Sequence, residues 1–333
     1  MNDYSTPLFG FDAPFSAMVF GTSGGIGSAI SQRIHKGMTL ANANLSDTSP
    51  TATSRMRYGV HQESIDPAND AAIIADQASA NAVVDSGQSF VLSVNKEQTR
   101  DASSQISQSL HHLFAINRSS KPESHSTVTG LQADALDESQ LVATKEAVQN
   151  SISEQQFAPL RLIVVGIGTL HQTGPDGTAT IRPEKTWRDL SADTMAKVFA
   201  ANTIAPALIA KHFLPLLPRS GRSVFAVLSA RVGSISDNRL GGWYSYRASK
   251  AALNQIIKTT SIELARTRPD AICIGLHPGT VDTGLSKPFQ ANVAEGKLFT
   301  PQTSANYLLN VISTATTSQS GSLLAWDGSV VPT

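Results

Sequence analysis

The sequence is nearly without cysteine, since Cys273 is the single one among 333 residues. An internal disulfide and a thiolate metal cluster each need at least two cysteines, so both are excluded. Cys273 lies in the apolar run Ala271–Leu276, where we expect it to be a small buried core residue. The histidines lack the carboxylate or second-histidine spacing of a metal site, and we expect no bound metal.

The chain also lacks an excess of charge of either sign, because 26 basic residues balance 26 acidic ones. Proteins that bind nucleic acid or anionic lipid neutralise phosphates with basic side chains, so we expect neither nucleic acid nor a membrane as partner. No run of about 18 apolar residues occurs. Residues Met1–Pro7 lack the basic region and apolar stretch of a signal peptide. These absences predict a soluble cytoplasmic protein.

Short apolar runs that end in glycine or small polar residues alternate with helical patterns. Apolar residues at helical spacing occupy Leu190–Leu217 and Tyr246–Arg266. The alternation predicts an α/β fold with a doubly wound parallel sheet, a Rossmann fold, whose ligands bind at the carboxyl ends of the strands. We expect buried strands at Ala17–Phe20, Leu113–Ile116, Leu162–Val165, Ser223–Leu228 and Ile272–Leu276.

The stretch from about Met38 to Ser109 breaks this rhythm, because Ser, Thr, Asn, Ala, Gln and Asp dominate it. The chain is also longer than the roughly 250 to 300 residues at which one core stops growing. We interpret residues 1–333 as a single Rossmann domain with a polar, partly mobile insertion at about residues 38–109. The first helix should end at the amino-terminal edge of the sheet, where the insertion begins. Ligands bind at the opposite, carboxyl edge, so we expect the insertion to be remote from that site and from Tyr246, the first residue of the helical pattern Tyr246–Arg266.

The first predicted strand runs directly into the glycine-rich segment Gly21–Gly27. A helical pattern, Ser28–Lys36, follows and is expected to stop at Gly37. The glycines allow a tight turn and a close backbone approach to a pyrophosphate, which the helix N-terminus would face with free N–H groups. At the end of a first strand this motif favours a dinucleotide site over a purely structural turn.

Tyr246 and Lys250 lie four residues apart at the start of a predicted helix, and therefore on one face of it. A cation beside a phenol stabilises the phenolate and moves its pKa towards neutral pH, so the tyrosine can exchange a proton with a substrate oxygen. Tyr244 has Ala248 at this spacing, so it lacks such a partner. The alternative is a chance pair on a solvated helix.

In context these residues resemble the classical short-chain dehydrogenase/reductase family. The resemblance covers about Ala17–Gly37 and residues 110–333, but not the insertion. It rests on Gly21–Gly27, Phe199–Thr203, Ser229, Tyr246–Lys250 and His277–Thr283. Ser229–Ile235, Gly241–Asn254 and Ala325–Gly328 are similar, more narrowly, to its C-factor-like and sniffer-like carbonyl reductase branch.

The resemblance implies a role for each matching residue. Tyr246 would be the general acid/base, and Lys250 would lower its pKa and bind the nicotinamide ribose. Asn202 would hold a proton-relay water, and Asp134 would contact the adenine unless it is a solvated loop acid or a helix cap. Hydride would move to or from the nicotinamide without a metal. The other residues expected to bind the cofactor are Gly21, Thr22, Ser23, Gly25, Ile26, Gly27, Gly168, Pro278, Gly279, Val281 and Thr283.

Two departures from the family pattern concern the active site. The usual catalytic serine position holds Ala230. Ser229 could take over the role through a local register change, Ser234 could substitute, or Tyr246 could hold the substrate alone. After the fourth strand only Gly168 remains of the usual Asn-Asn-Ala-Gly.

Asn117 and Arg118 end the second predicted strand, where an acidic residue would select NAD. Their side chains suit a 2′-phosphate, so we expect NADP, with NAD possible. The alternative interpretation is that Arg118 is an ordinary exposed charge at the end of a strand, without a role in cofactor binding.

The substrate is expected to be a small carbonyl compound or alcohol. Trp243, Tyr244 and residues 284–299 should wall its site and favour an apolar or aromatic molecule, and His171 is a further pocket candidate. The family's dimer helices correspond to Val198–Leu217 and Ala251–Leu264, so we expect a homodimer.

The leading interpretation is an NADP-dependent carbonyl reductase or alcohol dehydrogenase. A dinucleotide-binding signalling or regulatory protein on the same fold is the main alternative, because fold alone does not determine function. An epimerase or dehydratase of the extended branch is disfavoured by the glycine spacing.

Overall fold

The computed structural model describes residues 8–46, 111–154, 157–174, 176 and 178–333. Its centre is an eight-stranded sheet in the order β12-β11-β8-β7-β4-β1-β2-β3. Neighbouring strands are parallel except for β11 and β12. The strands are β1 (Ser16–Phe20), β2 (His112–Asn117), β3 (Val128–Gln132), β4 (Leu160–Val165), β7 (Ser223–Leu228), β8 (Ala271–His277), β11 (Leu323–Ala325) and β12 (Val330–Val331).

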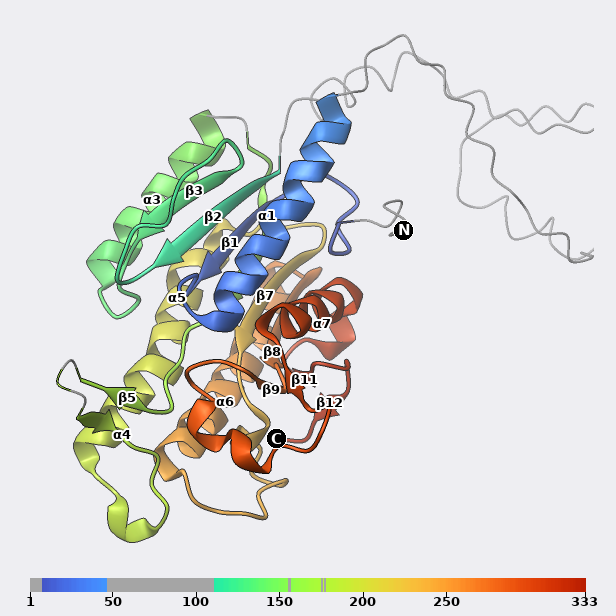
Figure 1. The fold of residues 1–333 in the computed structure, drawn as a ribbon. Helices are drawn as coiled ribbons and strands as arrows, with labels where there is room; N and C mark the ends of the chain where they lie inside the picture. Colours follow the sequence, from blue (N-terminus) through green and yellow to red (C-terminus); the bar gives the residue numbers. More distant parts are fainter. Residues whose placement is uncertain (1–7, 47–110, 155–156, 175, 177) are drawn as a thin grey trace, which may run out of the picture. The chain divides into compact units, whose positions relative to one another are not determined.

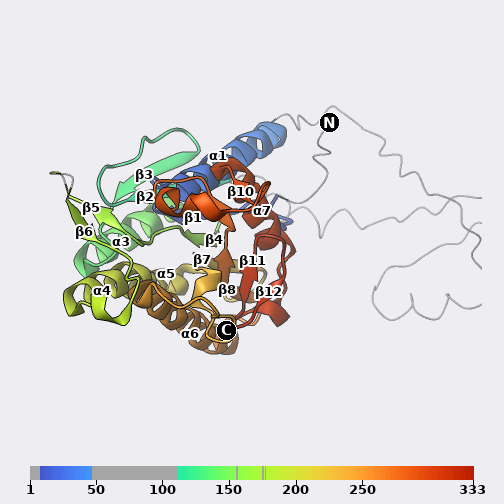
Figure 2. The same cartoon turned by 60° about the horizontal axis from the view of Figure 1, so that its bottom comes forward.

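Helices cover both faces of the sheet, which gives three layers (Figures 1 and 2). The first helical layer packs against Ala17 and Val19 of β1, and the second against Met18 and Phe20. This split follows from the alternation of side chains along a strand. The first layer contains α1 (Gly25–Ser46) and α7 (Pro301–Thr314), and the second contains α3 (Glu138–Glu154), α5 (Ala205–Phe213) and α6 (Tyr244–Thr267).

Shorter elements occupy the connections between these strands and helices. Helix α4 (Ala192–Phe199) continues through a π-helical turn at Ala200–Ile204 into α5. Two small ribbons are formed by β5 (Gln172–Thr173) with β6 (Ala179–Ile181) and by β9 (Thr280–Val281) with β10 (Leu298–Phe299). The 3₁₀ helices are Trp187–Asp189, Leu214–Leu216, Arg231–Gly233, Lys287–Asn292 and Thr317–Gln319.

Strand order reverses at β1, which lies between β2 and β4. The helices on the two sides of such a point diverge, so a crevice opens beyond the carboxyl ends of the strands. Phe20, Asn117 and Val165 end the three strands that meet there. The predicted doubly wound Rossmann fold is confirmed, and each of the five expected strands is present with bounds equal to or slightly longer than predicted.

The first helix does not stop at Gly37, so this prediction is wrong. Helix α1 continues to Ser46. A Cβ atom at Gly37 would lie 2.9 Å from the Leu8 Cδ1 atom and 3.5 Å from the Phe9 ring. The glycine therefore makes room for the N-terminal segment, although glycine inside a helix costs about 1 kcal/mol relative to alanine.

The predicted insertion at residues 38–109 begins in this extended helix. Residues 38–46 are helical, and residues 47–109 lie outside the described residues. The single-domain interpretation with an insertion therefore stays a prediction.

The apolar faces assigned to a dimer contact are used inside the subunit instead. Val198, Ile209, Leu253 and Ile257 are buried, and the last three pack against the sheet. The large hydrophobic side chains that remain exposed in these spans are Ile204 (48%) and Ile262 (51%). The homodimer therefore stays a prediction.

Candidate active site

The glycine-rich loop closes tightly between β1 and α1. Gly21 has φ +83°, a left-handed conformation that favours glycine. A Cβ atom at Gly27 would lie 2.2 Å from the Gly21 carbonyl oxygen, so no side chain fits there. Thr22 and Ile26 belong to the same loop and the first turn of α1. The glycines are therefore required by the tight turn itself, and the close approach of a pyrophosphate stays a prediction.

The segment after β8 lies against this loop. A Cβ atom at Gly25 would lie 2.5 Å from the Thr283 Cγ2 atom. Gly279 has φ +76°, and the Pro278 carbonyl accepts a hydrogen bond from the Ser304 hydroxyl of α7 (3.0 Å). Val281 is buried. The structure thus brings the two predicted cofactor-binding segments together.

Asn117 organises the end of β2. Its Oδ1 accepts hydrogen bonds from the Ser23 hydroxyl (2.8 Å) and from the Arg118 backbone N–H (2.9 Å), while its Nδ2 donates to Ser120 Oγ (3.2 Å). Arg118 is exposed. A pocket of about 510 Å³ opens here. Among its lining residues are six of the predicted cofactor ligands: Gly21, Ser23, Asn117, Arg118, Asp134 and Gly168.

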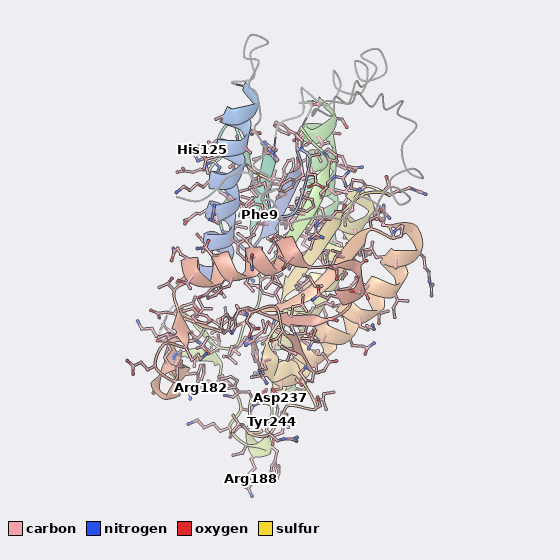
Figure 3. The ribbon with its side chains drawn as sticks, turned by 90° about the vertical axis from the view of Figure 1, so that its right-hand side faces the viewer. Phe9, His125, Arg182, Arg188, Asp237 and Tyr244 are labelled. Carbon is pink, nitrogen blue, oxygen red and sulfur yellow. The ribbon has the colours of Figure 1, made fainter. Side chains whose placement is uncertain are left out.

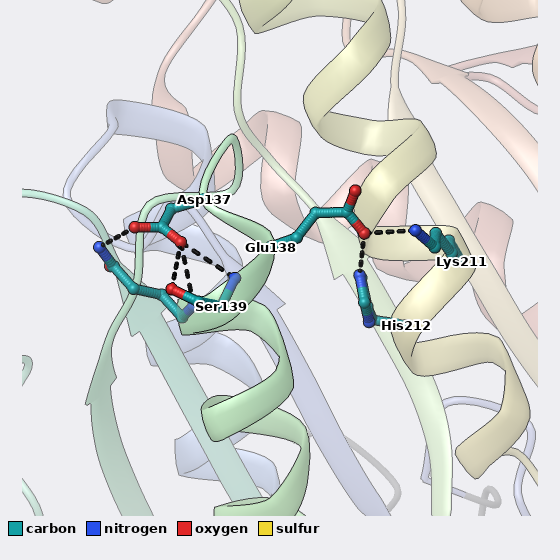
Figure 4. Close-up of polar contacts among 6 residues, drawn as sticks. Asp137, Glu138, Ser139, Lys211 and His212 are labelled. Carbon is teal, nitrogen blue, oxygen red and sulfur yellow. Dashed lines mark hydrogen bonds and ion pairs between the residues drawn. The ribbon is translucent and has the colours of Figure 1, made fainter.

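Asp134 lies in a turn that α3 holds in place. Its backbone N–H donates to Gln140 Oε1 (2.9 Å), and its Oδ1 accepts from the Leu136 N–H (2.9 Å). The cap at the start of α3 is Asp137, whose Oδ1 accepts from the Ser139 N–H (3.0 Å) (Figure 4). Asp134 is therefore a turn residue on the pocket wall rather than the helix cap.

Glu138 ties the start of α3 to α5. Its Oε2 accepts hydrogen bonds from Lys211 Nζ and from His212 Nε2, the latter at 2.8 Å (Figure 4). The hydrogen bond from Lys211 is the main reason that the pKa of Glu138 lies below its usual value. This exposed ion pair joins two helices of the second layer close to the adenine end of the predicted cofactor site.

Helix α6 carries Tyr246 and Lys250 on one face at the carboxyl edge. Lys250 is buried, its Nζ donates to the Leu228 carbonyl (2.9 Å) and lies 5.9 Å from the centroid of the Tyr246 ring. Burial lowers the pKa of Lys250 to about 8 and raises the pKa of Tyr246 to about 12. The expected lowering of the tyrosine pKa is thus not found in the chain by itself, because burial disfavours the charged phenolate.

Gly168 and Asn202 meet Lys250 from the other side. A Cβ atom at Gly168 would lie 3.2 Å from Asn202 Oδ1 and 3.5 Å from Lys250 Nζ. The Asn202 amide accepts from the Thr169 N–H (2.7 Å) and donates to the Thr169 carbonyl (2.8 Å) and Ser249 Oγ (3.0 Å). Its side chain therefore fixes the loop after β4 to α6. The predicted relay water at Asn202 stays a prediction.

Tyr246 is followed by a row of aromatic rings, those of Trp243, Phe289 and His171. The Trp243 ring lies 6.3 Å from Tyr246 and 4.8 Å from Phe289, and His171 lies 6.0 Å from Phe289. His171 Nε2 also bonds to the carbonyls of Gly284 (3.0 Å) and Leu285 (3.2 Å), so it carries hydrogen in this arrangement.

Two of the predicted wall positions differ in environment. Trp243 lies within the row of rings, whereas Tyr244 is 37% exposed at the lower end of Figure 3, together with Arg182, Arg188 and Asp237. Phe289 was not singled out in the sequence, although it lies in the predicted segment 284–299.

Comparison with known proteins identifies the family. The profile described as "short chain dehydrogenase" matches residues 95–294, more than half of the chain. The chain belongs to the short-chain dehydrogenase family. This confirms the resemblance seen in the sequence, and it places the protein among oxidoreductases.

Two curated relatives match the chain in part. C-signal of Myxococcus xanthus is 32% identical over 145 residues, which is 43% of this chain and 81% of that protein. The 1-hydroxy-2-glutathionyl-2-methyl-3-butene dehydrogenase of Rhodococcus sp. is 33% identical over 139 residues, 42% of this chain and 58% of that protein. The match therefore spans little more than half of the second relative.

Solved structures of this family share the fold over nearly the whole chain. The NADPH-bound carbonyl reductase from chicken fatty liver has a TM-score of 0.61 at 20% identity, covering 99% of this chain and all of that one. Carbonyl reductase Sniffer of D. melanogaster has a TM-score of 0.59 at 19% identity, covering 96% and 100%. At these identities the likeness shows the fold.

In this short-chain dehydrogenase the two serines near Ala230 already have hydrogen-bond partners within the protein. The Ser229 hydroxyl donates to Asn254 Oδ1 (2.7 Å) on α6. Ser234 Oγ accepts from the Asp237 N–H (3.1 Å). Ala230 itself is 9% exposed. A catalytic role for Ser229 would require its hydroxyl to leave Asn254, and that role stays a prediction.

The described residues of this short-chain dehydrogenase form neither a membrane span nor a metal-ligand cluster. Within the described ranges, no helix is both long and apolar enough to cross a bilayer. The same residues contain no group of three or more His, Cys, Asp or Glu side chains that could hold a metal ion.

Proposed function

We propose that this chain is an NADP-preferring carbonyl reductase, which interconverts a carbonyl and an alcohol with Tyr246 as general acid/base. The observation that carries the proposal is the convergence of Tyr246, Lys250 and Gly168 beside a pocket that the glycine-rich loop also lines. Relatives and neighbours support it, since their names include a dehydrogenase and an NADPH-bound carbonyl reductase.

The residues present fit a dinucleotide phosphate. Gly21 and Gly27 allow the tight turn after β1, and α1 begins directly behind it, so its N-terminal N–H groups would face a pyrophosphate. Arg118 and Ser23 stand at the end of β2, where a 2′-phosphate would bind. Asp134 and Leu136 would hold the adenine end, and Pro278–Thr283 would close the opposite side. When bound, the nicotinamide supplies or accepts the hydride.

Tyr246 supplies the proton in the direction of reduction. With its pKa raised to about 12 the hydroxyl stays protonated at neutral pH and can donate to a carbonyl oxygen. Lys250 is held by the Leu228 carbonyl, so its ammonium stays beside the tyrosine while the negative charge forms. Ser229 is the proposed second donor to the substrate oxygen.

The substrate side is apolar. Trp243 lies next to Tyr246, and Phe289 packs against Trp243, so their rings would exclude water from the reacting carbonyl. We therefore propose an apolar or aromatic aldehyde, ketone or quinone as the substrate class.

The direct test is NADPH oxidation followed at 340 nm against a panel of aldehydes, ketones and quinones. The proposal expects turnover with at least one apolar carbonyl compound, slower turnover with NADH, and loss of turnover in Tyr246→Phe. NADPH binding without turnover of any panel member would contradict a carbonyl reductase.

A further inference from the structure

Helix α6 begins without the cap that a helix of its length normally has. Its N-cap residue is Trp243, which has φ +51° and makes no side-chain capping bond. Serine, threonine, aspartate and asparagine are preferred at this position because their oxygen accepts the N–H of the second or third helical residue. The indole cannot accept such a bond. Because Tyr246 is the third residue of α6, a frayed start would misplace the proposed acid/base directly.

Glu184 supplies the missing cap from a distant part of the chain. Its Oε2 accepts from the Ser245 N–H (3.2 Å), and its Oε1 accepts from the Ser245 hydroxyl. Its backbone carbonyl accepts from the Trp243 N–H (2.6 Å). The side chain is 3% exposed. One residue thus binds the N-cap and the second residue of α6, on either side of Tyr244.

The backbone before Tyr246 needs such support. Gly241, Gly242 and Trp243 have φ +64°, +66° and +51°, three left-handed residues in a row, and tryptophan rarely adopts this conformation. Arg247 Nε donates to the carbonyls of Gly241 (3.2 Å) and Gly242 (3.0 Å), so α6 also holds this turn from its own first turn.

The left-handed turn places the indole where the site uses it, 6.3 Å from the Tyr246 ring and 4.8 Å from Phe289. A serine or aspartate at position 243 would cap α6 but would remove the indole ring that packs between Tyr246 and Phe289. Trp243 therefore serves the substrate site, and the capping oxygen comes from Glu184.

We infer that Glu184 is a positioning residue, which sets the location of Tyr246 and Trp243 by capping α6 through Ser245. The inference rests on the proposed function for its catalytic consequence, but the capping itself is a property of the chain. No local signal in the sequence marks it, because Glu184 and Ser245 are 61 residues apart.

Four variants test this role. Glu184→Ala removes the acceptor, and Glu184→Gln keeps one oxygen for the Ser245 N–H. Ser245→Ala removes only the hydroxyl bond and serves if Glu184→Ala fails to fold. Asp189→Asn is the matched control, because Asp189 caps the neighbouring 3₁₀ helix by accepting from the Thr186 N–H (3.0 Å).

The first readout is steady-state kinetics with NADPH affinity measured alongside. Displacement of an acid/base costs on the order of 10- to 100-fold in rate, so Glu184→Ala should lower kcat by about that factor with the Kd for NADPH unchanged. Glu184→Gln should recover most of the parent kcat. The kcat of Ser245→Ala should lie between those of Glu184→Ala and the parent, and the kcat of Asp189→Asn should equal that of the parent. The inference would be overturned if Glu184→Gln had as low a kcat as Glu184→Ala. It would also be overturned if the affinity for NADPH decreased in proportion to kcat.

The second readout does not depend on turnover. Hydrogen exchange of the backbone amides at 243–247 should be faster in Glu184→Ala than in the parent, and unchanged in Asp189→Asn. Equal exchange in Glu184→Ala and the parent overturns the capping role. If the parent reduces no carbonyl compound, the proposed function fails, while this exchange measurement still decides the role of Glu184.

Discussion

Asn42, near the end of α1, and His111, just before β2, are joined by two hydrogen bonds. Asn42 Nδ2 donates to the His111 carbonyl (2.9 Å), and the His111 N–H donates to Asn42 Oδ1 (2.9 Å). The chain on the two sides of residues 47–110 is therefore held together at the amino end of β2. Asn117, which lines the pocket proposed for the cofactor, lies at the opposite end of the same strand.

This link predicts that residues 47–110 are dispensable for cofactor binding. We expect that replacing them by a flexible linker of about ten glycine and serine residues leaves a folded protein with the NADPH affinity of the parent. Fluorescence titration with NADPH and circular dichroism measure the two properties. Asn42→Ala in the shortened protein should lower its unfolding midpoint, because the bridging bonds are lost. A soluble, folded deletion variant that no longer binds NADPH would show that the segment reaches the site.

Tyr246→Phe is expected to remove turnover without emptying the cofactor site. The phenol hydroxyl is the proposed proton donor, and its loss should lower kcat by about 100-fold or more. The ring itself is retained, so its contact with Trp243 and the Kd for NADPH should change little. Stopped-flow or steady-state NADPH oxidation, paired with a binding titration, measures both. Parent-like turnover in this variant would remove Tyr246 from the mechanism.

The sequence predicted the parts of the fold and site whose signals are local. Strands β1, β4, β7 and β8 are continuous apolar runs, and the spacing of Tyr246 and Lys250 alone places them on one helix face. Gly37 was misjudged because a glycine after a helical pattern usually marks its end. The reason for this glycine, contact with Leu8, comes from a segment almost thirty residues earlier.

The remaining features depend on contacts between distant segments, which no local pattern reports. Ser229 donates a hydrogen bond to Asn254, 25 residues away, so the direction of its hydroxyl could not be predicted from the sequence around it. His171 and Phe289 meet only because β4 and β8 end at the same edge of the sheet. The tyrosine pKa was misjudged for a related reason, because desolvation depends on the tertiary surroundings.

Arg118→Ala is expected to remove most of a preference for NADPH over NADH. A lost contact between a guanidinium and a phosphate costs on the order of 1 to 3 kcal/mol, and NADH lacks that phosphate. The Kd for NADPH should therefore rise while that for NADH stays constant. Lys121→Ala is the matched control, since Lys121 is also exposed and lies three residues further along the chain. Equal affinity of the parent for the two nucleotides would refute the cofactor assignment.

A homodimer stays a proposal, and if it uses the spans Val198–Leu217 and Ala251–Leu264, their exposed large apolar side chains are Ile204 and Ile262. Both are about half exposed on the helices that follow β4 and β7. If they form the contact, Ile262→Glu should convert a dimer into a monomer without changing the Kd for NADPH, and Glu263→Gln should leave the dimer intact. Light scattering at micromolar concentration gives the mass, for which one chain contributes 35.2 kDa. A monomeric parent protein would exclude this assembly.

Lys250 should give the protein a characteristic dependence of stability on pH. Its pKa is about 8 in the folded chain and 10.5 in an unfolded one, because burial disfavours the ammonium. Between these values the unfolded chain binds more protons, so the free energy of unfolding should rise with pH across this window. Below pH 8 both states carry the charge, and the full cost of burying it is present.

Lys250→Met isolates this effect. Tyr246 and Cys273 act in the opposite direction, since burial raises the pKa of each to about 12, and their stabilising effect is lost as the pH rises. Both groups remain in the variant, so their contributions largely cancel when the two proteins are compared. Urea unfolding of the protein without cofactor, at about pH 7.5 and about pH 9.5, should show a larger gain in unfolding free energy for the parent than for Lys250→Met. If the two proteins gain equally, Lys250 is already neutral at the lower pH or stays charged at the higher one, and in either case it does not titrate where its burial beside Tyr246 requires.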